Sequence, residues 1–195
     1  MAYAILTGFS PTRVVVRPVR PAILVPFEGT MAEQRGSLVG RTFYEFVVDY
    51  ILTPANAATL GAFFQARGQQ RDAFLWKPVR SRHYARTGIA VTPVSDGVTV
   101  TFALPTTGEY AGDYPVNDAT TLKLYRAGVL NAGAFSANVD NRTITTATVP
   151  AAGGAAMTAD YHRYALVRLD GVYEEEEAFV EMNSVRSLTF REVTS

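Results

Sequence analysis

The stretch Thr53–Gly68, TPANAATLGAFFQARG, decides the fold because it is a single helix signal in a chain that otherwise reads as strands. Thr53 suits the N-cap position, where its hydroxyl accepts a backbone N–H, and Pro54 suits the first helical position. Gly68 is placed to adopt the left-handed conformation that ends a helix. We therefore predict a helix from about Pro54 to Arg67, with an apolar stripe formed by Ala57, Leu60, Phe63 and Phe64.

Strand-like sequence flanks this helix on both sides, at Arg41–Leu52 and Asp72–Pro78. A strand, a packed helix and a strand make an α+β unit in which the helix covers one sheet face. The run Ser37–Leu52 mixes alternation with β-branched and aromatic residues, so it fits one extended strand or the second half of a long hairpin, in either register.

The sequence before this unit is extended but interrupted. Thr12–Phe27 is rich in valine, yet its prolines lack backbone donors, which favours an edge strand or an extended arm. Glu28–Gly36 is polar and is predicted as a loop.

The second half of the chain is predicted to be a series of short strands. Val79–Thr87 reads as a surface crossing, and turn signals then recur at regular spacing, which is typical of a small β-sandwich or barrel. The expected strands are Val98–Leu104, Leu122–Tyr125, Ala134–Val139, Thr143–Val149, Met157–Leu169 and Ser187–Val193.

We predict a mainly β (α+β) protein with two domains. Residues 1–86 and 164–195 would form a discontinuous β-sandwich or barrel domain with one packed helix. Residues 87–163 would form a small inserted β-sandwich domain, because insertion is tolerated where both ends emerge together at the surface. Two domains in series are the alternative.

The composition is that of an ordinary soluble protein of 195 residues. Eighteen basic residues balance eighteen acidic ones, so no overall field favours nucleic acid or an anionic membrane. There is no cysteine, which excludes disulfides and thiolate chemistry. No apolar run approaches the length of about 20 residues that spans a bilayer, so we expect no membrane insertion.

Catalytic motifs are missing from the sequence. His83 and His162 are the only histidines, and neither has the spacing of a metal site. We therefore expect no enzymatic activity, no cofactor and no bound metal. The acidic pair Glu109 and Asp113, with Tyr110 and Tyr114, leaves three readings open: an ordinary structural loop, a sugar-binding site formed by Tyr110, Asp113 and Tyr114, or an acid–base pair that cleaves polysaccharide.

Two charged segments stand out. Glu174, Glu175, Glu176 and Glu177 form a run of adjacent carboxylates, which is either a solvated loop or an acidic rim or lumen facing a DNA path. The arginines of Val79–Thr87 are better explained by pairing between subunits or domains than by nucleic-acid binding.

The segment Phe63–Arg82 resembles the distal tail protein family of siphophages and gene transfer agents. The family's helix end matches Phe64, Arg67 and Gly68, and its aromatic strand matches Phe74, Trp76, Lys77 and Pro78. Further segments are similar in order along the chain: Asp96–Leu104, Val139–Gly153 and Tyr164–Asp170. The chain departs from the family where Asn141 and Arg142 replace a turn glycine and where Leu169 replaces phenylalanine, and the first forty residues match poorly.

This resemblance implies a structural virion protein of the tail tip or baseplate. Such proteins form a ring, usually of six copies, that caps the tail tube, connects it to the baseplate hub protein and lets DNA pass without specific binding. Their first domain looks like the tail-tube fold. For such a ring we expect the subunit contacts on the extended run Ser37–Leu52 and on the edges offered by Val14–Phe27. The expected interface residues are Arg41, Phe43, Glu45, Val47, Asp49, Arg80 and Arg82. The rival reading is a carbohydrate-binding baseplate module that contacts host glycans.

Overall fold

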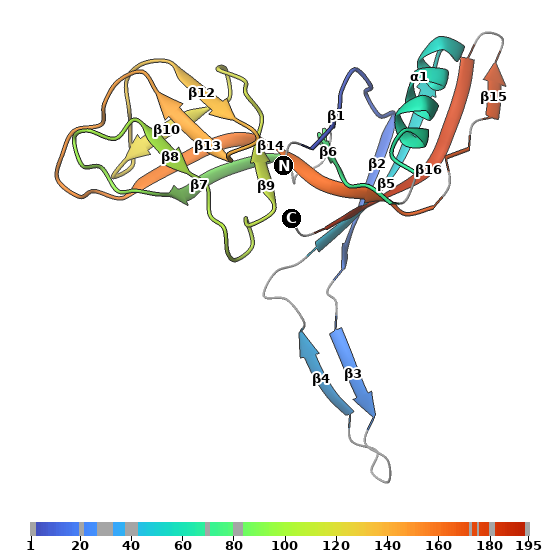
Figure 1. Ribbon diagram of the computed structural model, residues 1–195, viewed down its shortest axis with the longest axis horizontal. Helices are drawn as coiled ribbons and strands as arrows, with labels where there is room; N and C mark the ends of the chain where they lie inside the picture. The colour runs from blue at the N-terminus through green and yellow to red at the C-terminus, as the bar shows by residue number, and fades with distance from the viewer. Residues whose placement is uncertain are drawn as a thin grey trace.

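The computed structural model describes residues 3–19, 22–26, 33–37, 43–68, 71–79, 84–171, 173–174, 176–179 and 182–193. It shows a mainly β protein with one helix, which confirms the predicted fold class (Figure 1). The described strands form open sheets of eleven, three and two strands rather than a closed barrel.

The largest sheet has the order β1-β6-β14-β16-β5-β2. We call this path the helix-bearing sheet. Its strands are β1 (Ile5–Leu6), β6 (Phe74–Trp76), β14 (Met157–Leu169), β16 (Met182–Glu192), β5 (Phe43–Leu52) and β2 (Arg13–Val19). The short strand β15 (Glu176–Phe179) pairs with β16.

Helix α1 (Pro54–Gln65) packs on one face of this sheet, as predicted. The Thr53 hydroxyl accepts a hydrogen bond from the Asn56 N–H at 3.4 Å, so Thr53 is the N-cap. Gly68 has a φ of 57°, which is the left-handed conformation expected at the helix stop. The buried helix residues Ala57, Leu60 and Phe64 join a core that includes Phe46, Phe74, Trp76 and Phe190.

The remaining strands form a second lobe, which we call the β module (Figure 1). It consists of the first half of β14 together with β7 (Ala85–Val91), β8 (Thr101–Ala103), β9 (Asp113–Pro115), β10 (Lys123–Arg126), β11 (Val129–Leu130), β12 (Phe135–Asn138) and β13 (Thr143–Thr146). A three-stranded sheet, β12-β13-β8, packs against β7, β10 and β14, and together they enclose a separate core that includes Phe102, Leu124, Ile144 and Tyr161.

Strand β14 belongs to both lobes. Its first half pairs with β7 and β10, its middle (Arg163–Ala165) pairs with β9, and its last part pairs with β6 and β16. Met157, Ala159 and Tyr161 alternate into the core of the β module, whereas Arg163–Val167 is buried throughout. The division into a first domain of residues 1–86 and 164–195 and an inserted domain of residues 87–163 stays a prediction. Strand β14 crosses the boundary between these two domains.

The N-terminal third forms a long hairpin. β2 pairs with β5 from Arg13↔Asp49 to Val19↔Phe43, and farther along the chain β3 (Ala22–Pro26) pairs with β4 (Glu33–Ser37). Of the two alternatives left open for Ser37–Leu52, these pairings favour the second half of a long hairpin, and of those left open for Thr12–Phe27 they favour an edge strand, since β2 pairs on one side only among the described residues. The predicted loop Glu28–Gly36 is wrong in its second half, because Glu33–Ser37 is a strand paired with apolar β3.

Two predictions in the middle of the chain also need correction. The surface crossing Val79–Thr87 ends earlier than predicted, since β7 begins at Ala85 and pairs with β14. The Tyr110–Tyr114 segment is more than a loop, because β9 begins at Asp113 and also pairs with β14. In the described part of the chain, no helix has the length and hydropathy needed to cross a membrane.

The N-cap gives the first prediction. Replacing Thr53 by alanine removes the side-chain acceptor at the start of α1, so the free energy of unfolding should fall by about 1 kcal/mol. Thr59→Ala is the matched control, because the Thr59 hydroxyl bonds the Ala55 carbonyl within the helix and caps nothing. Urea unfolding followed through Trp76 fluorescence measures both variants, and equal effects would contradict the capping role.

Candidate functional site

The helix-bearing sheet has an outer face, turned away from α1. On β5, Phe46, Val48, Tyr50 and Leu52 point into the core, whereas Glu45, Val47 and Asp49 lie half-buried on the outer side. This alternation settles the register that the sequence left open.

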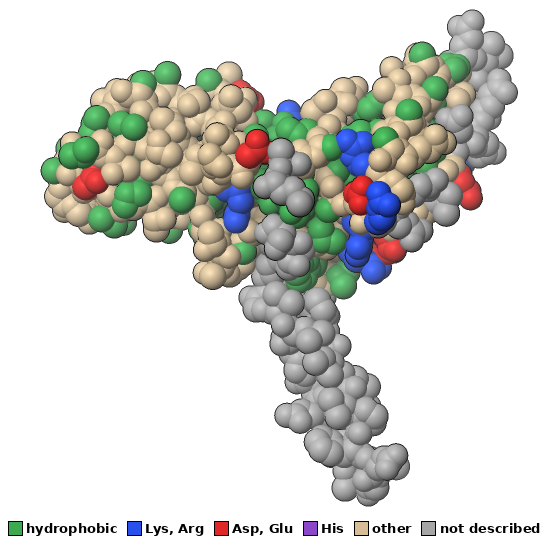
Figure 2. Space-filling model, viewed as in Figure 1, with side chains coloured by type: hydrophobic (Ala, Val, Ile, Leu, Met, Phe, Trp, Pro, Cys, Tyr) green, Lys and Arg blue, Asp and Glu red, His purple; other side chains and the backbone are tan. Residues whose placement is uncertain are grey.

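Arginines and carboxylates alternate across this outer face. Arg17 and Arg191 each approach the Glu45 carboxylate at 3.4 Å, and Arg191 also pairs with Asp170 at 2.6 Å. Arg13 lies 3.9 Å from Asp49. Figure 2 shows basic and acidic side chains next to one another over this part of the molecule. Exposed pairs of this kind contribute about 0–1 kcal/mol each, so they leave a surface of balanced charge that adds little stability.

The predicted subunit contacts are only partly on this face. Glu45, Val47 and Asp49 share it, and by the alternation of β5 so does Phe43, but Phe43 is only 7% exposed and offers little surface for a contact. Asp49 also has a structural role, because its carboxylate accepts the Ser187 N–H at 2.7 Å where the β5–β16 register shifts. Arg41, Arg80 and Arg82 lie outside the described residues.

The acidic run lies beside the same sheet. Glu174 is exposed, and Glu176 and Glu177 belong to β15, opposite Ser184 and Asn183 of β16. Glu175 lies outside the described residues. An acidic rim or lumen formed by this run stays a prediction.

A buried charge network joins the two lobes. The Asp113 carboxylate on β9 pairs with Arg86 of β7 and with Arg163 of β14, each at 2.7 Å. The same Arg163 nitrogen also pairs with Glu192 of β16 at 2.8 Å. Glu192 in turn accepts the Tyr44 N–H of β5 at 2.9 Å. The network therefore runs from β7 and β9 of the β module through β14 and β16 to β5 of the helix-bearing sheet.

The charged side chains of this network stabilise one another in a buried environment. The side chains of Asp113, Arg163 and Glu192 are 1%, 3% and 6% exposed. Burial alone would lower the pKa of Arg163, but the charges and hydrogen bonds of Asp113 and Glu192 raise it above its ordinary value. Burial, and then the Asp113 charge, raise the pKa of Tyr161, whose hydroxyl bonds the Asp113 carboxylate at 3.3 Å.

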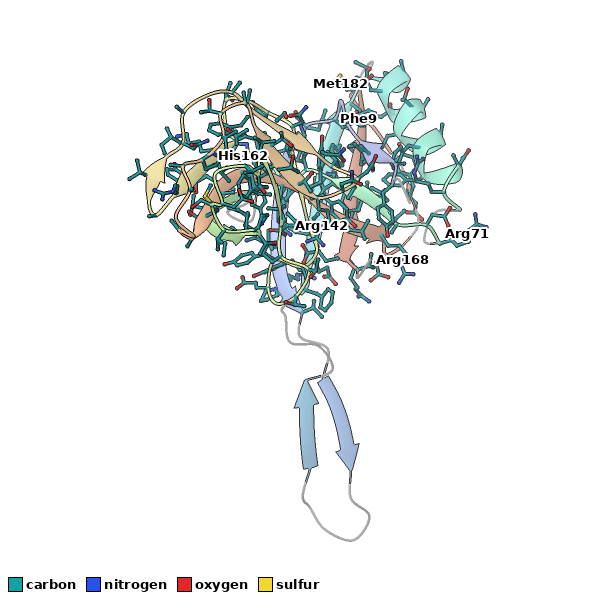
Figure 3. All side chains as sticks on the ribbon, turned by 60° about the vertical axis from the view of Figure 1, so that its left-hand side comes forward. Phe9, Arg71, Arg142, His162, Arg168 and Met182 are labelled. Carbon is teal, nitrogen blue, oxygen red and sulfur yellow. The ribbon has the colours of Figure 1, made fainter. Side chains whose placement is uncertain are left out.

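Arg142 fixes the loop that carries Asp113. It sits in a tight turn with a φ of 55°. Its guanidinium donates to the carbonyl oxygens of Asp113 at 2.9 Å, Pro105 at 2.7 Å and Tyr110 at 3.2 Å. Figure 3 shows Arg142 within the body of the molecule, away from the β3–β4 pair. The strained backbone of this residue is thus accompanied by a side chain that holds three loop carbonyls.

The sugar-contact assignment of Asp113 and Tyr114 needs correction. Asp113 is 0% and Tyr114 is 4% exposed, so neither offers a surface on which a glycan could rest. Tyr110 is half-buried, with the Arg86 guanidinium 5.3 Å from its ring centre. Asp113 is also unavailable as a partner for Glu109 in acid–base chemistry, because its two oxygens face Arg86, Arg163 and Tyr161.

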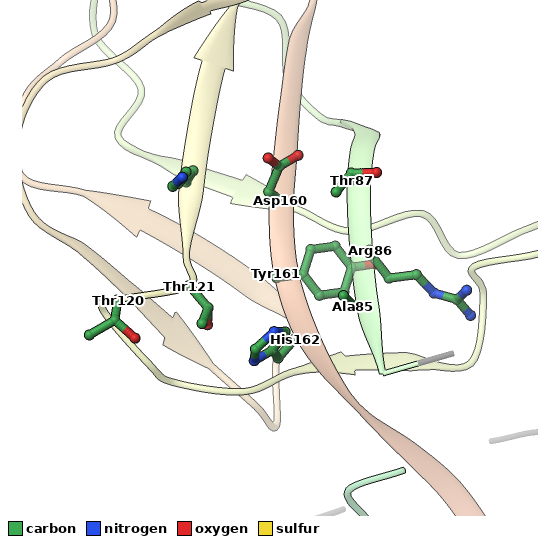
Figure 4. A pocket seen from close by; sticks show the side chains of 9 residues that line it. Ala85, Arg86, Thr87, Thr120, Thr121, Asp160, Tyr161 and His162 are labelled. Carbon is green, nitrogen blue, oxygen red and sulfur yellow. The ribbon is translucent and has the colours of Figure 1, made fainter. Parts of the chain in front are cut away.

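Described residues line two surface hollows, and neither is lined by the residues predicted for subunit contacts, the acidic rim or a glycan. One, of about 250 Å³, lies over β7, β10 and β14. Figure 4 shows Thr121 and His162 together there, while the Arg86 side chain extends away from them. His162 stacks on Tyr84 with ring centres 4.2 Å apart. The other, of about 570 Å³, lies beside Tyr3 and Arg67. Among the described residues no group of three or more His, Asp or Glu side chains could hold a metal.

Sequence reasoning missed Arg163, Glu192 and the role of Arg142. A signal for Arg163 was present, because the second half of β14 is mostly apolar apart from Arg163 and Arg168, and an arginine that such a strand buries must find a carboxylate. Glu192 gave no such signal, since it lies in the polar C-terminal segment and is buried only through the pairing of distant strands.

Comparison with known proteins gave a limited result. No protein-family model and no curated protein matches the chain. Among solved structures, the chain is similar to a chain in the virion of a native gene transfer agent particle, with a TM-score of 0.43 and 15% sequence identity. The likeness covers 98% of this chain and 97% of that chain. At this TM-score the likeness carries no argument about function.

The buried network gives the second prediction. Asp113→Asn leaves Arg86 and Arg163 without their shared carboxylate, so the free energy of unfolding should fall by about 3–5 kcal/mol. Asp140→Asn is the control, because Asp140 is exposed in the β12–β13 turn, and it should change stability by less than about 0.5 kcal/mol. Chemical unfolding of both variants measures the difference. A change as small as that of the control would show that the network does not join the lobes.

The buried tyrosines give the third prediction. Burial raises the pKa of Tyr50 and of Tyr161 above the ordinary value of about 10, so the unfolded chain releases these protons first. Their contribution to stability is complete below pH 10 and is lost as pH rises above it. The unfolding midpoint of the wild type should therefore fall above about pH 10, and it should fall less in the double variant Tyr50→Phe/Tyr161→Phe. Parallel pH profiles would contradict the assignment.

Proposed function

We propose that this chain is a structural protein of a phage-like particle that assembles as a closed ring, of six copies by the family resemblance, at the distal end of a tail tube. It acts without enzymatic activity and without a cofactor. Its other partners would be the tail tube protein and the baseplate hub protein, and DNA would pass through the ring without specific binding.

The long hairpin is the observation that carries this proposal. β3 and β4 pair only with each other in the described part of the chain, and Figure 1 shows them beyond the end of β2 and β5. An isolated two-stranded hairpin is marginally stable in water. A neighbouring copy that packs on the hairpin supplies the support that its own lobes do not provide.

Open sheet edges support the same assembly. Within the described residues, β2 pairs on one side only, with β5, and β15 pairs on one side only, with β16. Unpaired edges are a liability for a monomer, and head-to-tail contacts that close into a ring remove them.

The outer sheet face supports passage of DNA. The paired side chains on this face are Arg13, Arg17, Arg191, Glu45, Asp49 and Asp170. These paired groups cancel one another, and Arg168, which is exposed directly opposite Arg191, adds one further positive charge. A channel bordered by this face would therefore attract a polyanion only weakly. The acidic run Glu174–Glu177 would add to this effect at the rim.

The test of the proposal uses the register of the hairpin. Val19 and Phe43 lie directly opposite each other, so an Asn-Gly turn can join them in place of residues 20–42. Native mass spectrometry and electron microscopy should show rings for the wild type and single protomers for this shortened variant, with Trp76 fluorescence unchanged.

A second shortened variant is the matched control. Pro26 and Glu33 are also directly opposite, and an Asn-Gly turn in place of residues 27–32 keeps β3 and β4. This variant should still form rings. A wild type that stays a single protomer at high concentration and in assembled particles would overturn the proposal, as would full rings from the variant that lacks the whole hairpin.

A further inference from the structure

The segment that joins β14 to β15 is held against helix α1 by a tyrosine. Tyr173 lies between these two strands in the chain, and its hydroxyl donates to the Ala57 carbonyl of α1 at 2.8 Å. Its ring is half-buried at the margin of the main core, and the ring centres of Tyr173 and Phe64 are 5.6 Å apart. Tyr173 therefore fixes this segment to the helix through both its polar and its apolar atoms.

Helix α1 has a seat for this tyrosine at Gly61. The glycine is buried in the interior of the helix, where glycine is less favourable than alanine. A Cβ at this position would lie 3.0 Å from a ring carbon of Tyr173, which is closer than an ordinary van der Waals contact. The close approach of the Tyr173 ring thus accounts for a residue that the helix itself does not favour. We call Ala57, Gly61 and Tyr173 the tyrosine anchor.

Strand β15 needs this anchor because its own pairing is short. It has four residues, it pairs on one side only among the described residues, and its register shifts between Glu177 and Phe179. Figure 1 shows β15 next to β16, at the end of the sheet that carries α1. A strand this short forms few backbone hydrogen bonds with its neighbour, so other contacts must limit its local opening.

The anchor lies close enough to β15 in the chain to hold it. Residues 174 and 175 alone separate Tyr173 from Glu176, the first residue of β15, so the chain between them reaches at most about 11 Å. Without the anchor, β15 would be tied to β14 only through residues 170–175, a longer span whose closure costs more conformational entropy.

The core under α1 has other aromatic contacts besides this tyrosine. Phe64 also packs on Phe74 and Phe190, with ring centres 5.7 and 6.0 Å apart, and all three side chains are fully buried. Tyr173 lies at the margin of this cluster, so its loss should loosen β15 before it disturbs the core.

We propose that Tyr173 is a positioning residue for the contact between copies of this chain, because the tyrosine anchor holds β15 as an open edge with which the next copy pairs. This inference rests on the proposed ring function, in which a neighbouring copy completes the open edges of β2 and β15. An edge strand that is already ordered loses less entropy on pairing, so the anchor should raise the affinity of one copy for the next.

Three substitutions test the anchor, and a fourth is the matched control. Tyr173→Ala removes the ring and the hydroxyl, Gly61→Leu fills the seat while it favours the helix, and Tyr173→Phe removes the hydroxyl alone. Tyr125→Ala is the control, because Tyr125 is also half-buried and its hydroxyl donates to Asp160 of the β module at 3.0 Å. Trp76 fluorescence checks that every variant keeps the fold.

Native mass spectrometry at increasing protein concentration measures ring formation. The concentration at which half of the protomers enter rings should rise about tenfold for Tyr173→Ala and for Gly61→Leu, and it should stay within about twofold of the wild type for Tyr125→Ala. Tyr173→Phe should have a smaller effect than Tyr173→Ala, because its ring still fills the seat. Backbone amides of β15 should exchange faster in the Tyr173→Ala protomer than in the wild-type protomer, and at the wild-type rate in Tyr125→Ala.

Rings at the wild-type concentration in both Tyr173→Ala and Gly61→Leu would overturn the inference, and so would an equal loss of rings in Tyr125→Ala. Unchanged exchange of β15 in Tyr173→Ala would also overturn it, since the anchor would then hold nothing. A wild type that forms no rings would instead overturn the proposed function. The exchange of β15 is measured on the protomer and does not depend on that outcome, so the two failures are distinguishable.

Discussion

Arg163 is the residue on which the arrangement of the two lobes depends. One of its nitrogens lies 2.7 Å from Asp113 and 2.8 Å from Glu192, so a single buried cation joins β9 of the β module to β16 of the helix-bearing sheet. A buried charge that loses its partner costs several kcal/mol, and this penalty favours the one arrangement in which both carboxylates meet Arg163. Strand β14 is shared by both lobes. The network therefore holds the two lobes together at the point where the chain passes from one core to the other.

This rigid connection gives the proposed assembly its geometry. The open edge of β2 belongs to the helix-bearing sheet, and the β3–β4 pair lies beyond the end of β2 and β5, whereas the β module lies at the other end of β14. A protomer that forms a ring through its sheet would therefore hold every copy of the β module at the same angle.

Local signals in the sequence account for the parts that could be predicted. The helix has a capping threonine, a proline at its first position and a glycine stop, all of which act within a few residues of one another. The alternation in β14 likewise predicts its bounds, because one of its faces is buried along its first half. These elements depend on the chain near them, so the sequence alone indicates them.

Features that depend on distant pairing could not be predicted. The polar residues of β4 show no strand pattern, and they are extended because β3 lies opposite. Asp113 sits in a glycine- and tyrosine-rich segment that suggests a surface loop. Only the approach of Arg86 and Arg163, 27 and 50 residues away in the chain, makes it a buried ion pair. The predicted glycan contact failed at Asp113 for that reason.

Hydrogen exchange of backbone amides, compared between the isolated protomer and the assembled form, tests the central claim most directly. If copies of this chain complete one another's sheets, the amides of β3, β4 and the free edge of β2 should exchange rapidly in the protomer and become strongly protected on assembly. The amides of β13, inside the β module, should not change. Equal exchange of β2, β3 and β4 in both states would contradict the account.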